Sequence, residues 1–61
     1  MQQEIHYPNG SLRAVIYEYS GQTEVYNAYG SLLGVYNHHT NETIDVHGQF
    51  VGRGNLLMTL I

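Results

Sequence analysis

Hydrophobic and polar residues alternate over short distances along this chain, and glycine interrupts most windows long enough for a helix. Apart from the last residues, 55–61, no segment keeps apolar residues at the spacing of a helix face. Short runs rich in Val, Ile, Leu and Tyr alternate instead with turn residues such as Gly, Asn and Ser. This pattern predicts an all-β fold of about six or seven short antiparallel strands. The expected strands lie at about 3–7, 11–19, 22–27, 31–37, 43–46, 49–52 and 55–60.

Three segments share one order of residue types around a glycine. A β-branched residue opens each segment, and Leu or Phe follows two residues after the glycine, with Ala or Gly two residues later. The glycines are Gly10, Gly30 and Gly48. Glycine supplies the positive φ that a tight turn requires, so each segment predicts a β-hairpin, and its small residue lets another strand or side chain approach closely. We expect one small domain, 1–61, of three imperfect hairpin repeats at about 5–24, 25–43 and 44–61.

The second segment resembles a known hairpin repeat. Its sequence at 26–36, Tyr-Asn-Ala-Tyr-Gly-Ser-Leu-Leu-Gly-Val-Tyr, is similar to the Tyr-Asp-x-x-Gly-x-Leu repeat of YD-repeat shells, with Asn27 in place of the aspartate. The chain also resembles the small β-flower-type proteins, which stack glycine-turn hairpins of this kind. The resemblance covers about 50 residues and implies an all-β hairpin assembly, with no activity attached to it.

Apolar residues on both faces of the longest strands change the expected assembly. In strand 11–19, Tyr17 and Tyr19 lie on the face opposite to Ile16, although a sheet wetted on one side alternates apolar and polar residues. A chain of 61 residues without cysteine has too little mass to cover both faces, so we expect a second copy to cover one of them. Tyr17 and Tyr19 are the first candidates for that interface, because tyrosine buries a ring while its hydroxyl keeps a polar partner.

The last residues of the chain form a second apolar feature. Chain ends are generally polar and fray, so an apolar end needs a cover. We expect four residues to pack in a subunit interface, namely Leu56, Leu57, Leu60 and Ile61. The alternative is that they complete the core of their own chain. The three leucines also fit one face of a short helix in place of strand 55–60.

Composition and charge exclude several functions. Charged residues make up 11% of the chain, and the net charge is −3 with Arg13 and Arg53 as the only Lys or Arg residues. A nucleic-acid interface needs a cationic stripe and a polybasic membrane contact needs clustered Lys or Arg, so neither partner is expected. The first four residues are polar, without a basic segment followed by an apolar run, and no apolar stretch is long enough to cross a bilayer. We therefore expect a cytoplasmic location.

Residues with catalytic or metal-binding chemistry are scattered. A serine follows each of the first two turn glycines, but no nucleophile, base and orienting residue form a recognisable set. No catalytic residue and no cofactor are therefore predicted. His38 and His39, with Asp45 and His47 downstream, come nearest to a zinc site. Because adjacent strand residues point to opposite faces, no metal ligand is assigned to them.

The sequence favours a non-enzymatic β module that self-associates and interacts with another protein. The apolar faces and the small size carry this hypothesis. The alternative is a small ligand-binding or metal-binding protein, with its site at the symmetry axis of the oligomer or near His38 and His39. A third hypothesis is that the chain is a structural piece of a larger particle.

Overall fold

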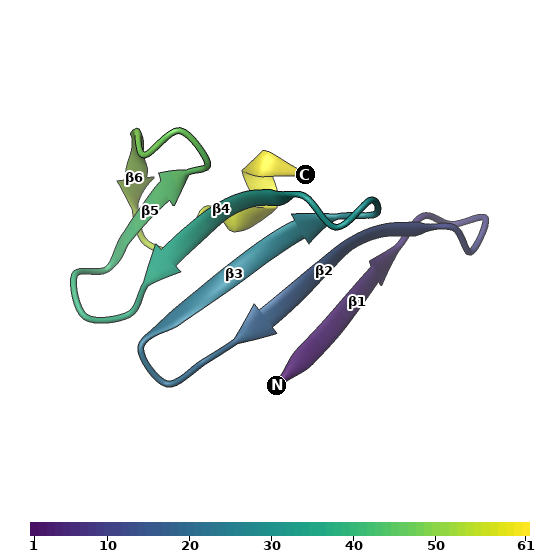
Figure 1. The fold of residues 1–61 in the computed structure, drawn as a ribbon, viewed down its shortest axis with the longest axis horizontal. Coiled ribbons are helices and arrows are strands. Elements are labelled where there is room, and N and C mark those ends of the chain that lie inside the picture. Colours follow the sequence, from purple (N-terminus) through teal and green to yellow (C-terminus); the bar gives the residue numbers. More distant parts are fainter.

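A six-stranded antiparallel sheet makes up most of the protein, and its strands follow one another in chain order from edge to edge (Figure 1). The computed structural model describes all 61 residues. The elements are β1 (Gln2–His6), β2 (Leu12–Glu18), β3 (Gln22–Asn27), β4 (Leu32–Asn37), β5 (Glu42–Asp45), β6 (Phe50–Arg53) and the 3₁₀ helix η1 (Leu57–Leu60). The predicted all-β fold of antiparallel hairpins in one small domain is confirmed.

Three of the turns share one backbone geometry. Their glycines, Gly10, Gly30 and Gly48, have φ values of +91°, +86° and +82°, a region that glycine enters without steric cost. Two to four residues after each glycine, within the following strand, the register of strand pairing shifts by one residue, as it does at a β-bulge. The turn chemistry expected from the sequence is therefore present in β1–β2, β3–β4 and β5–β6. The number of sequence repeats stays a prediction.

In two of these turns, the side chain of the first residue stabilises the turn through hydrogen bonds. The side-chain oxygen of Asn27 accepts hydrogen bonds of 2.9 and 3.0 Å from the N–H groups of Tyr29 and Ser31. Asp45 accepts two bonds of 2.9 Å at the equivalent positions of its own turn. Such side chains offer the backbone an alternative to the strand ladder and so favour a turn. The amide or acid at the last position of the strand is thus a turn-forming residue.

The chain's own C-terminal segment covers one face of the sheet. After β6, Gly54 adopts a φ of +87°, and the chain returns beneath the sheet to pack η1 against β4 (Figure 1). Leu57 of η1 meets Ala14 of β2 and Val25 of β3, and these are the fully buried hydrophobic residues of the protein. The core is therefore a thin layer between η1 and the central strands.

Two glycines make room for this segment. A Cβ at Gly34 would lie 2.9 Å from the carbonyl oxygen of Ile44 and would collide with the side chain of Leu60. A Cβ at Gly52 would lie 2.5 Å from Cδ1 of Leu56. The prediction that the small residues of the hairpin pattern allow a close approach is confirmed at these two positions. They form the recess in which the tail lies.

The C-terminal segment corrects two expectations. Residues 57–60 form η1, so the strand predicted at 55–60 is wrong and the short helix is observed. Leu57 is 1% exposed within its own chain, so it is a core residue and has no surface left for a second subunit. The other three residues of the predicted interface are half-buried, namely Leu56, Leu60 and Ile61. The tail packs in the glycine recess of its own sheet, and a contact of these three residues with a second copy stays a prediction.

Candidate functional site

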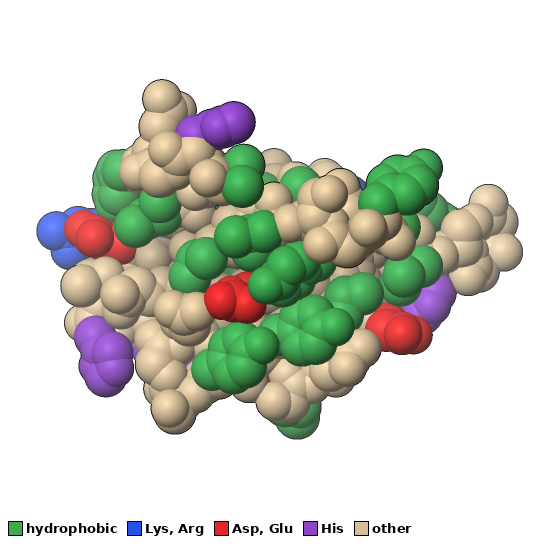
Figure 2. Space-filling model, viewed as in Figure 1, with side chains coloured by type: hydrophobic (Ala, Val, Ile, Leu, Met, Phe, Trp, Pro, Cys, Tyr) green, Lys and Arg blue, Asp and Glu red, His purple; other side chains and the backbone are tan.

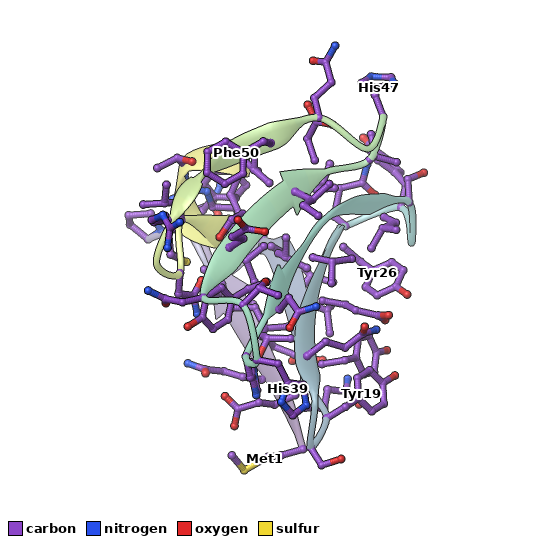
Figure 3. All side chains as sticks on the ribbon, turned by 90° about the vertical axis from the view of Figure 1, so that its left-hand side faces the viewer. Met1, Tyr19, Tyr26, His39, His47 and Phe50 are labelled. Atoms are coloured by element: carbon purple, nitrogen blue, oxygen red, sulfur yellow. The ribbon has the colours of Figure 1, made fainter.

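The face of the sheet opposite η1 has no cover from the chain, and we call it the open face. Figure 3 shows η1 on one side of the sheet and the labelled Tyr19 and Tyr26 on the other. The pairing register aligns one row of open-face side chains across five strands: Tyr17, Glu24, Val35, Ile44 and Phe50. Hydrophobic side chains form a band over this face, with an acidic group in their midst (Figure 2). The open face is therefore a hydrophobic band that contains one carboxylate.

Tyr17 and Tyr26 are the aromatic centre of the open face. Their ring centroids lie 5.4 Å apart and their planes meet at 90°, the edge-to-face arrangement that aromatic pairs prefer. Val15 pairs with Tyr26 across β2 and β3. Together with Tyr19, which is 52% exposed, these side chains line a shallow hollow of about 310 Å³ that reaches the β3–β4 turn. We call it the tyrosine hollow.

Glu24 does not line the tyrosine hollow itself but contacts Tyr26, which does, and it carries the only charge of the row from Tyr17 to Phe50. Its carboxylate oxygens accept hydrogen bonds from the Tyr26 hydroxyl, at 2.8 Å, and from the Gln22 side-chain amide, at 2.6 Å. The bond to this carboxylate, aided by desolvation, raises the pKa of the Tyr26 hydroxyl above its ordinary value of 10.0. The salt bridges of the protein consist of one contact of 3.6 Å between His6 and Glu4. Glu24 therefore has no cationic partner within the chain.

A second hollow, of about 330 Å³, lies beside the tail near the β1–β2 and β3–β4 turns. Nη2 of Arg13 donates a 3.3 Å hydrogen bond to the carbonyl oxygen of Ile61. The guanidinium of Arg13 also lies 5.6 Å from the ring centroid of Tyr7, within the range of a cation–π contact. The cation of this hollow is therefore already engaged by the chain itself.

The two adjacent histidines serve different contacts. Nε2 of His38 lies 2.7 Å from the hydroxyl of Thr23, a residue that is 3% exposed. The ring of His39 lies beside Gly21 in the β2–β3 turn. No three His, Cys, Asp or Glu side chains come close enough together to hold a metal ion. The metal-binding alternative thus has no ligand set around His38 and His39.

The structure divides the predicted interface residues between two surfaces. Tyr17 and Tyr19 lie on the open face, whereas the four tail residues lie on the covered side or in the core. Sequence reasoning missed Glu24, Val35 and Ile44 as members of the open face. Strand alternation places each of them on the face opposite to its chain neighbours. Their alignment in one row depends on the register of the strand pairs, which the sequence alone does not give.

Comparisons with known proteins leave the functional assignment to the geometry. No protein-family model matches the chain, and no curated protein or solved structure matches it. The resemblance to YD-repeat and β-flower-type proteins stays a prediction. The single helix, η1, has four residues, and no helix has the length and hydrophobicity that a membrane crossing requires. The side chains of the open face therefore carry the argument for function.

Proposed function

We propose that this protein is a non-enzymatic β module that self-associates through its open face. The supporting observation is the unequal cover of the sheet, since η1 packs on one face and the chain leaves the row from Tyr17 to Phe50 at the surface of the other. Burial of apolar surface is the main favourable term in most protein association. A second copy supplies the missing cover, with tyrosines suited to the centre of such an interface.

The thin core supports the same proposal. Ala14, Val25 and Leu57 are the only fully buried hydrophobic residues, and the chain has no cysteine. A domain of this size buries only about 60% of the surface that its unfolded chain exposes. Small domains generally gain the missing stability from disulfides, a metal or a partner subunit. With neither a disulfide nor a metal-ligand cluster in the chain, a partner subunit is the source that remains.

The size of the open face suits an interface between two copies. The molecule extends 35 × 22 × 17 Å, and the sheet presents its two longer dimensions to the viewer of Figure 1. The rectangle of the two longer dimensions, roughly 770 Å², is close to the ~800 Å² that each partner buries in a standard interface. A contact over most of this face would therefore reach the size of a standard interface.

The variant Ile44→Glu tests self-association, because it places a charge in the hydrophobic band. We expect light scattering across a concentration series to find an oligomer for the natural chain and a 6.9 kDa monomer for the variant. Val46→Glu is the matched control, since Val46 is 52% exposed in the β5–β6 turn outside the band. Circular dichroism checks that both variants keep the sheet. A natural chain that is monomeric at every concentration contradicts the proposal, and so does an Ile44→Glu variant that is folded and still oligomeric.

A further inference from the structure

We propose that the tyrosine hollow binds an organic cation with a quaternary ammonium group. This proposal goes beyond self-association, because it assigns a ligand to the aromatic centre of the open face, where the ligand and a second copy compete for Tyr17 and Tyr19. It rests on the aromatic lining of the hollow, the carboxylate that contacts Tyr26 and the absence of any Lys or Arg among its lining residues. No other group of side chains in the protein combines these three properties.

The aromatic rings supply the first part of such a site. A cation is attracted to the negative face of an aromatic ring when it lies within about 6 Å of the centroid. The rings of Tyr17 and Tyr26 stand edge to face at 90°, so a ligand in the corner between them lies against the free face of one ring and the outer part of the other. Tyr19 adds a third ring to the lining. Aromatic corners of this kind recognise quaternary ammonium ions.

The carboxylate of Glu24 supplies the charge. Glu24 pairs directly with Tyr17 across β2 and β3, and its carboxylate accepts the hydroxyl proton of Tyr26 in a hydrogen bond. That bond draws negative charge toward the Tyr26 ring, and each carboxylate oxygen keeps a free lone pair. The net charge of the chain, −3, favours a cation further. A positive ligand therefore meets the partner that Glu24 lacks within the chain.

Size and polarity favour a methylated cation over a free amine. The hollow of about 310 Å³ lies at the lower end of the range for ligand pockets, so it suits a small head group. Val15, Ala28 and the tyrosine rings give it an apolar lining. A primary ammonium is strongly hydrated and loses that hydration on an apolar surface, whereas methyl groups pack against it favourably.

A titration with charged and uncharged probes of one shape tests the site. Choline is compared with its carbon analogue, in which a tert-butyl group replaces the trimethylammonium group, at constant ionic strength set with sodium chloride. We expect choline to shift the tyrosine NMR signals with saturation, and the uncharged analogue to bind at least about tenfold more weakly. The titration uses the Ile44→Glu variant beside the natural chain, so that the hollow is also measured where a second copy does not cover it. Equal binding of choline and its uncharged analogue to the variant, or no saturation of the variant with choline, overturns the proposal.

Variants locate the binding. We expect Tyr17→Leu to weaken choline binding at least about fivefold, and Glu24→Gln to do the same. Tyr29→Leu is the matched control, because Tyr29 is 94% exposed and lies outside the tyrosine hollow. An equal loss in Tyr29→Leu overturns the assignment. Circular dichroism identifies any variant that has lost its fold, and the comparison of choline with its uncharged analogue on Ile44→Glu does not depend on the tyrosine and glutamate variants.

The Ile44→Glu variant separates this proposal from self-association. Its substitution lies two strands away from Glu24, and the tyrosine hollow does not include it. Choline binding to this variant supports the hollow whether or not the natural chain is an oligomer. A trimethyllysine peptide, titrated beside choline, distinguishes a protein side chain from a free metabolite as the source of the cation. If neither choline nor the trimethyllysine peptide binds to Ile44→Glu or to the natural chain, the ligand proposal is overturned. The measurement of the oligomer is unaffected by that result.

Discussion

The hydroxyl of Thr43 donates a 2.6 Å hydrogen bond to the carbonyl oxygen of Gly54, which joins β5 to the segment that leads into η1. The same hydroxyl accepts a 3.0 Å bond from the N–H group of Leu56. Thr43 has no exposed surface, so these bonds satisfy backbone groups at a point where water does not reach its hydroxyl. One side chain therefore fixes the path by which the tail passes beneath the sheet.

Thr43→Val tests this contact, because valine keeps the shape of threonine and removes the hydroxyl. We expect the free energy of unfolding to fall by about 1–3 kcal/mol, since the part-buried carbonyl of Gly54 and the part-buried N–H group of Leu56 lose their partner. Urea unfolding followed by circular dichroism measures the change. Thr40→Val, in the exposed β4–β5 turn, is the control and should stay within about 0.5 kcal/mol. Equal effects of the two variants would show that the Thr43 hydroxyl does not hold the tail.

Gly34→Ala tests the recess beneath the tail. The added Cβ would meet the carbonyl oxygen of Ile44 and the side chain of Leu60, so we expect a loss of about 1–3 kcal/mol. Thermal unfolding measures it. Gly21→Ala is the matched control, because its Cβ would meet only the ring of His39, at 3.4 Å. That control should be neutral or gain up to about 1 kcal/mol, and an unchanged melting temperature for Gly34→Ala would refute the recess.

Leu57→Ala tests the place of the tail in its own core. Removal of a fully buried leucine leaves a cavity, so we expect a loss of about 2–5 kcal/mol, a large share of the stability of a small domain. Met58→Ala is the control at the neighbouring position, where the side chain is 52% exposed. Denaturation at several protein concentrations completes the test. A contact within one chain loses the same free energy at every concentration, whereas a loss that shrinks on dilution would place Leu57 between subunits.

The hydrogen bond between Tyr26 and Glu24 gives a pH dependence with a definite sign. It raises the pKa of the Tyr26 hydroxyl above 10.0 in the folded protein, so above pH 10 the unfolded chain releases this proton first. The stability that the bond contributes is fully present below pH 10 and is lost as the pH rises through the folded pKa. Tyrosinate absorbance should show one of the six tyrosines titrating late. Glu24→Gln should move that titration back toward the ordinary range, and an unchanged curve would contradict the bond.

Much of the fold could be predicted because its determinants are local. The turn at Gly30 depends on a glycine with positive φ and on the Asn27 side chain, both within a few residues of each other. Six of the expected strands are present with bounds close to those predicted. The tail could not be assigned in the same way, because its leucines fit a strand and a helix equally well, and their packing on Gly34 and Gly52 settled the choice.

The candidate site shows the same division. Tyr17 and Tyr19 could be placed on one strand face from alternation, which is a property of any single strand. Glu24, Val35 and Ile44 join them only after the register of neighbouring strands is known. Residue types along the chain were enough to specify hairpins, since turn conformation acts over a few bonds. The covered and open faces of the sheet follow from contacts between residues far apart in the chain, such as Gly34 with Leu60. The face that the tail covers therefore depends on the packing of the tail against the assembled sheet, and not on the local sequence of the tail.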